Sequence, residues 1–166
     1  MFTSEDMLAE LAQESAVTRL ALERVPEDRY SWRPHPKAQS VGQLAYHVAV
    51  IPMALAGVAM QERFLVGHQP PRPEPASRQE LLAVYEQSLA KAKEILGRLD
   101  QAGIEAPWRL VQGEQVILEI PRHAFIRTIL FNHWYHHRGQ LSTYLRLLDV
   151  KVPAIYGPSA DELPFG

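Results

Sequence analysis

Apolar residues recur at helical spacing in four segments of this chain. A side chain on an α-helix returns to the same face every three or four positions, so each segment predicts an amphipathic helix. The predicted helices cover residues 4–25, 40–66, 77–100 and 122–148. Four such helices predict an all-α fold, a four-helix bundle.

Polar residues and prolines mark the ends of these helices. Ser40-Val41-Gly42-Gln43 and Ser77-Arg78-Gln79-Glu80 have the pattern of capping boxes, in which the serine and the residue three positions later satisfy free backbone N–H groups. Pro26 ends the first helix. Pro52 lies inside the second helix, where it removes one backbone hydrogen bond, so a kink or a division is expected there.

The segments between the helices have patterns of their own. Residues 106–120 show short apolar runs around Gly113, which predicts a short hairpin before the fourth helix. Residues 67–76 contain four prolines and predict a stiff surface connection. From about residue 150 the chain reads as an irregular tail. A length of 166 residues predicts one domain, residues 1–166.

Two histidines share the apolar stripe of the fourth predicted helix. His133 and His137 are four residues apart, which places their Cβ atoms roughly 5–6 Å from each other on one face. Leu130 and Leu141 lie on the same face, so both imidazoles are expected to point inward. A buried ring nitrogen without a partner costs about 1–3 kcal/mol, and a bound metal ion removes that cost.

A third ligand must come from another helix, and His47 is the best candidate because it lies among apolar residues of the second helix. Three imidazoles with an open coordination position are typical of a catalytic zinc site. Nickel and other late first-row metals accept the same ligands. The alternative is a metal-free bundle in which the histidines are polar residues of a tight core.

The remaining histidines are not expected to join this cluster. His136 is rotated by about 100° from His137 around the helix axis, so it is expected to face solvent or to form a subunit contact. His123 lies about 15 Å from His133 along the helix axis. His35 and His68 fall in proline-rich loops and are expected to be solvated.

Two neighbours of the histidine pair have separate expectations. Gln140 lies close to the histidine stripe and is a candidate substrate-binding residue that orients a ligand. Arg138 points elsewhere and is expected to form a salt bridge or a helix–helix or subunit contact.

Composition narrows the function. With 17 Lys and Arg against 19 Asp and Glu, the chain lacks the basic excess of a nucleic-acid-binding protein. It has no cysteine, so neither a disulfide nor a cysteine nucleophile is available. Trp134 follows His133 where a metalloprotease helix would carry its glutamate, which disfavours proteolysis.

No membrane or export segment is predicted. The longest apolar run, residues 48–60, contains Pro52 and is too short to span a bilayer. The first residues are acidic and lack the apolar core of a signal peptide. A cytoplasmic protein is therefore expected.

Several motifs together resemble the DinB/YfiT-like family. The fourth predicted helix carries Asn132-His133-x-x-His136-His137-Arg138-Gly139-Gln140-Leu141, which resembles the signature of that family. Trp32-Arg33-Pro34, followed by Ser40-Val41-Gly42-Gln43-Leu44 and His47, resembles its loop and second-helix motif. The ending Val152-Pro153-x-x-Tyr156-Gly157-Pro158-Ser159 is also similar to members of the group.

The resemblance implies a bundle of up-down-down-up topology and, often, a homodimer. It also implies a divalent metal held by three histidines, which here are His47, His133 and His137. Members of the family include thiol S-transferases that use bacillithiol or glutathione and a mycothiol-dependent maleylpyruvate isomerase.

The leading hypothesis is therefore a divalent-metal-dependent, thiol S-transferase-like enzyme acting on an electrophilic small molecule. Ligation to a metal favours the reactive thiolate form of a low-molecular-weight thiol. A non-catalytic, metal-dependent stress-response or small-molecule-binding protein is the alternative.

Overall fold

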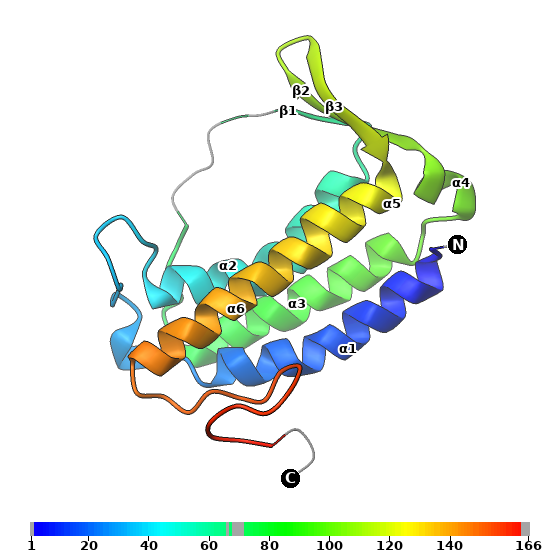
Figure 1. The fold of residues 1–166 in the computed structure, drawn as a ribbon. Helices are drawn as coiled ribbons and strands as arrows, with labels where there is room; N and C mark the ends of the chain where they lie inside the picture. The colour runs from blue at the N-terminus through cyan, green and yellow to red at the C-terminus, as the bar shows by residue number, and fades with distance from the viewer. Residues whose placement is uncertain (1, 66, 68–71, 164–166) are drawn as a thin grey trace.

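Four long helices form the body of the protein, for which a computed structural model describes residues 2–65, 67 and 72–163 (Figure 1). Helices α1 and α6 run from the end that carries the hairpin to the opposite end, and α2 and α3 run back. This arrangement confirms the predicted fold class. The bounds are α1 (Ser4–Glu23), α2 (Val41–Ala59), α3 (Arg78–Leu96) and α6 (Asn132–Leu147).

A small sheet caps one end of the bundle. Strand β2 (Pro107–Gln112) pairs antiparallel with β3 (Gln115–Pro121), and β1 (Arg63–Leu65) pairs parallel with β2. The turn of the hairpin contains Gly113 with φ +60°, a conformation that favours glycine. The predicted hairpin is confirmed, whereas β1 was not predicted. The short helices are η1 (Glu27–Arg29) and α4 (Gln101–Glu105).

Helix α2 ends at Ala59, earlier than the predicted end near residue 66. The carbonyl of Val58 accepts from Trp108 Nε1 at 3.1 Å, and the carbonyl of Ala59 accepts from Arg122 Nε at 2.6 Å. These side chains satisfy carbonyl groups that are left free at a helix end. The chain beyond is then available to form β1. Residues 66 and 68, the latter the histidine expected to be solvated, lie outside the described residues.

The two predicted capping boxes differ. At Ser40 both halves are present, because Ser40 Oγ accepts from Gln43 N and Gln43 Oε1 accepts from Ser40 N. At Ser77 the serine accepts from Glu80 N, but the Glu80 carboxylate accepts from Ala76 N instead. The second box is therefore only half formed, although the helix begins where it was predicted.

Pro52 links α2 to its neighbours. Since proline has no N–H, the carbonyl of Val48 loses its partner within the helix. Trp134 Nε1, fully buried on α6, donates to that carbonyl at 3.0 Å. The residue after Pro52 contacts α3, because Met53 N donates to Ser88 Oγ at 3.0 Å. The helix continues through Pro52, and the freed backbone group becomes a contact with α6.

The fourth predicted helix consists of three parts. It begins as α5 (Arg122–Phe125), passes through a π-helix, η2 (Ile126–Phe131), and continues as α6. The prediction of one uniform α-helix was therefore wrong over 126–131. A π-turn holds more residues per turn than an α-turn, so it changes which residues of α5 share a face with those of α6.

Within the described part of the chain, α2 alone has the length and apolar composition that could cross a membrane. Half of this apolar stretch is buried inside the protein. Leu44, Val48 and Ile51 are almost fully enclosed by the other helices. Helix α2 is therefore the core helix of the bundle.

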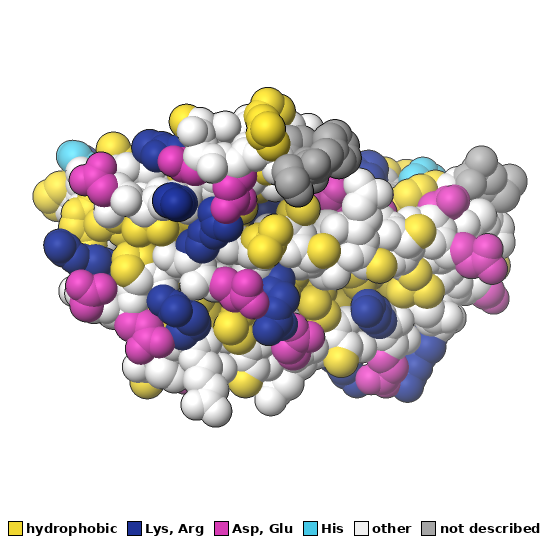
Figure 2. Space-filling model, turned by 90° about the horizontal axis from the view of Figure 1, so that it is seen from below, with side chains coloured by type: hydrophobic (Ala, Val, Ile, Leu, Met, Phe, Trp, Pro, Cys, Tyr) yellow, Lys and Arg dark blue, Asp and Glu magenta, His cyan; other side chains and the backbone are white. Residues whose placement is uncertain are grey.

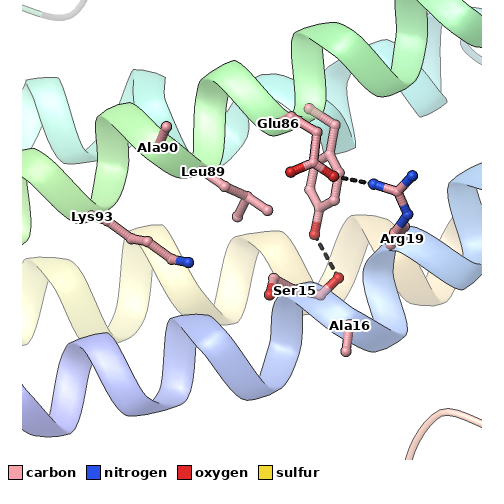
Figure 3. A pocket seen from close by; sticks show the side chains of 8 residues that line it. Ser15, Ala16, Arg19, Glu86, Leu89, Ala90 and Lys93 are labelled. Carbon is pink, nitrogen blue, oxygen red and sulfur yellow. Dashed lines mark hydrogen bonds and ion pairs between the residues drawn. The ribbon is translucent and has the colours of Figure 1, made fainter.

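Charged side chains of both signs are interspersed with apolar ones over the face seen in Figure 2. A groove of about 280 Å³ lies between α1 and α3 (Figure 3). Tyr85 Oη donates to the carbonyl of Ser15 at 2.7 Å there, and Arg19 forms an ion pair with Glu86. No histidine lines this groove.

Candidate metal centre

Three histidines meet between α2 and α6. His47 comes from α2, and His133 and His137 come from successive turns of α6. One ring nitrogen of each lies within 4.8 Å of those of the other two. His47 Nε2 and His133 Nε2 are 3.2 Å apart. The structure thus brings together the three residues that the sequence singled out.

The packing of α2 against α6 sets this arrangement. The four-residue spacing puts His133 and His137 on one face of α6, with ring centroids 4.4 Å apart. The bond from Trp134 Nε1 to the Val48 carbonyl joins residues that directly follow His133 and His47. It therefore fixes the position of α6 along the axis of α2 next to the cluster.

All three imidazoles are held in the neutral form. Burial, together with the nearby charge of Arg72, lowers the pKa of His47 to about 3. Burial also lowers the pKa of His137 to about 4 and depresses that of His133. Since a neutral imidazole has a free lone pair, these residues are ready to bind a cation at neutral pH.

Gln140 fixes the orientation of one ligand. Its Oε1 lies 2.7 Å from His137 Nδ1, so the imidazole donates from Nδ1 and keeps Nε2 for the cluster. Such a partner on the outer nitrogen is the usual support of a metal-binding histidine. The candidate residue Gln140 therefore contacts a predicted ligand, one helical turn along α6.

The donor set fits a metal ion. Three neutral imidazoles converge from two rigid helices, and no carboxylate of the described residues belongs to the cluster. Nitrogen donors of this kind suit zinc, nickel and other late first-row metals. The cluster can therefore bind a divalent metal, and its ligands alone do not choose among these ions.

A pocket opens beside the cluster. It has a volume of about 540 Å³ and is lined by residues of α2 and β1 and by residues 67, 72 and 73. His47 and His133 form part of its wall, together with Arg72. The rest of the wall is mainly apolar and includes Val50, Ile51, Leu55 and Phe64. A small molecule in this pocket would lie next to a metal bound by the histidines.

The remaining histidines of the described chain do not belong to the converging group, as expected, although the ring centroids of His136 and His137 are 5.1 Å apart. His136 is exposed, on the side of α6 away from the buried face. His123 Nδ1 is 3.5 Å from a carboxylate oxygen of Glu105. His35, in the loop before α2, accepts a hydrogen bond from the backbone N–H of Lys37.

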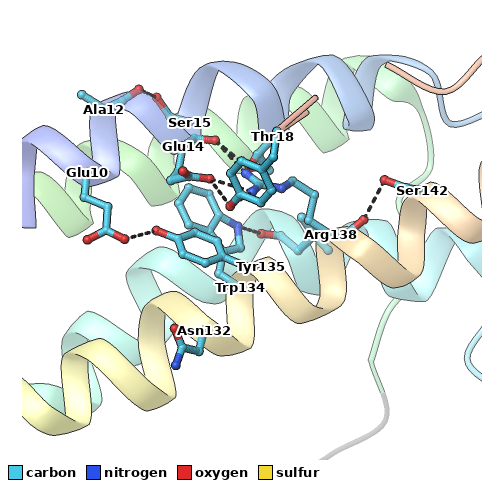
Figure 4. A network of polar contacts seen from close by, with 12 residues as sticks. Glu10, Ala12, Glu14, Ser15, Thr18, Asn132, Trp134, Tyr135, Arg138 and Ser142 are labelled. Atoms are coloured by element: carbon cyan, nitrogen blue, oxygen red, sulfur yellow. Dashed lines mark hydrogen bonds and ion pairs between the residues drawn. The ribbon is translucent and has the colours of Figure 1, made fainter. Parts of the chain in front are cut away.

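Arg138 forms a salt bridge, one of the contacts expected for it, and this ion pair is buried. It is 1% exposed, and its guanidinium donates to Glu14 Oε2 at 2.6 Å and to Thr18 Oγ1 at 2.9 Å (Figure 4). Tyr156 from the tail donates to the same Glu14 oxygen at 2.8 Å. This network joins α1, α6 and the tail on the side of α6 that faces α1.

Sequence reasoning missed Glu14 and Arg72. Glu14 follows the helical spacing of the buried positions Leu11 and Thr18, but a carboxylate there reads as a surface residue until its partner is known. Arg72 lies in the proline-rich connection, which has no periodicity. The Arg-Pro pair at 72–73 gave no indication that Arg72 would share the wall of a pocket with His47 and His133.

Comparisons with known proteins agree with this description. The family model described as "DinB family" matches residues 1–163. A DinB-like protein from Bacillus cereus is 23% identical, with a TM-score of 0.71 over 92% of this chain and 97% of its own. A DinB-like protein from Bacillus subtilis is 18% identical, with a TM-score of 0.67 over 89% and 94%. No curated protein matched the chain significantly.

Proposed function

The chain belongs to the DinB family, and on this basis we propose that it is a divalent-metal-dependent enzyme of the thiol S-transferase type. In this reaction a low-molecular-weight thiol attacks an electrophilic small molecule. The observation that carries the proposal is the cluster of three neutral histidines, two of which, His47 and His133, form part of the wall of a mainly apolar pocket. The cluster supports a metal site, and the pocket supports a small-molecule substrate.

The residues of the chain have distinct roles in this proposal. His47, His133 and His137 hold zinc or nickel, and Gln140 keeps the His137 ring in the orientation that offers Nε2. A bound divalent cation favours the thiolate form of a thiol, which is its nucleophilic form. The apolar wall around Val50, Ile51 and Phe64 holds the electrophile and excludes water.

The nucleophilic sulfur must come from a co-substrate, because the chain has no cysteine. The thiol releases its proton to solvent, and its sulfur forms a bond to the electrophilic carbon. The leaving group departs from that carbon with the bonding electron pair. The protein contributes position and a dry environment, which are large terms in reactions between two bound partners.

Turnover of candidate thiols tests the proposal. Metal-loaded protein is mixed with 1-chloro-2,4-dinitrobenzene and, in turn, glutathione, bacillithiol and mycothiol. At least one thiol should react above the uncatalysed rate, and His47→Ala should abolish the gain. His136→Ala, an exposed neighbour of His137, is the matched control and should keep the activity. No acceleration with any thiol on fully loaded protein contradicts the proposal.

A non-catalytic, metal-dependent binding role is the second candidate, since the pocket would serve it equally well. Thermal-shift measurements with a small-molecule panel separate the two. Ligands that stabilise the metal-loaded protein without forming product support binding alone, whereas product formation supports the enzyme.

We also propose that the protein works as a homodimer in the cytoplasm. Dimers are expected from the resemblance to the family, and light scattering on the purified chain tests for one. The cytoplasm keeps thiols reduced, which this chemistry requires. Fractionation of cells that express the tagged chain tests the location.

A further inference from the structure

Three cationic side chains line a hollow of about 410 Å³ next to the metal centre. They are Arg33 and Lys37 from the loop before α2, and Arg72 from the connection that follows β1. Within the described chain, no carboxylate forms an ion pair with any of the three. By contrast, Arg19, Arg24, Arg109, Arg127, Arg138 and Arg146 all have carboxylate partners.

The hollow adjoins the pocket at the histidines. Arg72 lines both spaces and therefore lies at their boundary. Gln43 lines the hollow, and His47 lines the pocket. These two residues are four positions apart on α2, which corresponds to a rise of about 6 Å on one face. A small molecule can therefore contact the cations and the metal centre at once.

The capping box of α2 holds Arg72 in this place. Gln43 Nε2 donates to the carbonyl of Arg72 at 3.2 Å, and Ser40 Oγ donates to Glu74 Oε1 at 2.5 Å. Glu74, the nearest carboxylate along the chain, is thereby engaged by Ser40. The charge of Arg72 also contributes to the lowered pKa of His47 and His133, so its field reaches the cluster.

We propose that the hollow of Arg33, Lys37 and Arg72 binds the anionic end of the thiol co-substrate and directs its sulfur toward the histidines. The co-substrate is then a thiol with at least one carboxylate, and the apolar pocket remains for the electrophile. This inference rests on the proposed function, because it assigns the binding site of the thiol in that reaction. Unpaired cations that are already in place favour an anion over a neutral ligand.

Calorimetry with a blocked thiol tests the hollow without any turnover. The probe is S-methylglutathione, which keeps both carboxylates but cannot form a thiolate, and the comparison is its diethyl ester. Both are titrated into the metal-free and the metal-loaded full chain at low salt. The acid should bind about tenfold more tightly than the ester, and the Arg33→Gln/Lys37→Gln double variant should remove this difference.

Lys93→Gln is the matched control, because Lys93 lines the α1/α3 groove and has no ion pair with a described carboxylate. It should leave the preference for the acid unchanged. Equal affinity for acid and ester in the unaltered chain overturns the inference, as does an equal loss in Lys93→Gln. If Arg72→Gln weakens binding of octanoate but not of S-methylglutathione, the cation belongs to the electrophile site, and the inference is also overturned.

Failure of the proposed function gives a different result. If no thiol reacts but the acid is still preferred through Arg33 and Lys37, the anion site stands and the transferase proposal falls. If 2-mercaptoethanol, which has no carboxylate, reacts with the same kcat/KM as glutathione, the transferase stands and the anion site is overturned.

Discussion

At the scale of single residues, each histidine of the cluster is neutral because it is partly buried beside a cation. Burial is the largest cause of the lowered pKa of His47, His133 and His137, and Arg72 adds to it. A neutral ring that has been removed from water still needs partners for its nitrogens. A metal ion meets that need for three rings at once, which gives a physical reason for placing them together.

We expect each histidine of the cluster to be required for metal binding. The purified chain should hold about one divalent ion, and His47→Ala, His133→Ala and His137→Ala should each bring this close to zero, since two imidazoles rarely retain such an ion. Elemental analysis after dialysis measures the content. His136→Ala should match the unaltered chain. Full metal content in His47→Ala would show that the third ligand lies elsewhere.

Gln140 should affect metal affinity without being a ligand. Removing its carbonyl oxygen in Gln140→Ala frees the His137 ring to rotate and to change tautomer, so we expect affinity to fall about 10- to 100-fold. Competition with a chromophoric chelator measures the affinity. Gln87→Ala, at an exposed position of α3, serves as the control. Unchanged affinity in Gln140→Ala would contradict a positioning role.

At the scale of elements, the contact between α2 and α6 depends on a proline. Pro52 leaves the Val48 carbonyl without its helical partner, and Trp134 supplies another one. The sequence showed the proline and predicted a disturbed helix. It did not show which side chain would use the freed carbonyl, because Trp134 is 86 residues away along the chain.

A double-mutant cycle tests this link. Trp134→Phe should lower the free energy of unfolding by about 1–3 kcal/mol, since the buried Val48 carbonyl loses its partner. In a Pro52→Ala background the new N–H can bond to that carbonyl, so the cost of Trp134→Phe should be smaller. Urea denaturation of the four proteins measures the coupling. Equal costs in both backgrounds would show that the proline and the tryptophan act independently.

Helix starts were easier to predict than helix ends. Ser40 and Ser77 were identified because a cap and its partner lie within four residues of each other. The end of α2 at Ala59 was missed because its carbonyls are satisfied by Trp108 and Arg122, which come much later in the chain. The π-turn of η2 likewise has no local pattern that distinguishes it from an α-helix.

At the scale of the whole molecule, one buried ion pair joins three parts of the chain. Glu14 of α1 and Arg138 of α6 are 5% and 1% exposed, and Tyr156 attaches the tail to both. The guanidinium also lies 5.2 Å from the centre of the Tyr135 ring. This network packs α6 against α1 on one side, while the histidine cluster lies on the side of α6 that faces α2.

Breaking one half of the pair should destabilise the protein strongly. Arg138→Met leaves the Glu14 carboxylate buried without its cation, and we expect a loss of about 3–5 kcal/mol in the free energy of unfolding. The double variant Glu14→Leu/Arg138→Met should recover much of that loss, because no uncompensated charge remains. Guanidinium denaturation measures both. A loss below about 1 kcal/mol in Arg138→Met would contradict the role given to the pair.

The metal-free protein should lose stability in mild acid. Unfolded imidazoles have a pKa near 6.5, whereas His47 and His137 in the folded chain have values of about 3 and about 4. As the pH falls from about 6.5 to about 5, the unfolded chain binds protons that the folded chain does not, so stability falls with pH. Above that window the contribution is fully present.

Denaturation midpoints of chelator-treated protein across this window measure the effect. Carboxylates contribute little there, because in the unfolded chain they titrate near pH 4. His47→Ala should make the pH dependence shallower, since one lowered group is removed. A midpoint that does not change between the two pH values would contradict the neutral state of the cluster.

The sequence by itself determined the four amphipathic helices, the hairpin and the choice of His47, His133 and His137. Each of these follows from short-range patterns: helical spacing, caps, a glycine turn, and histidines on apolar faces. Tertiary structure alone decided the partners that are distant in sequence. Examples are the hydrogen bond from Trp134 to the Val48 carbonyl, the ion pair of Glu14 with Arg138, and the position of Arg72 beside His47 and His133. These contacts depend on how the helices pack, which no local pattern records.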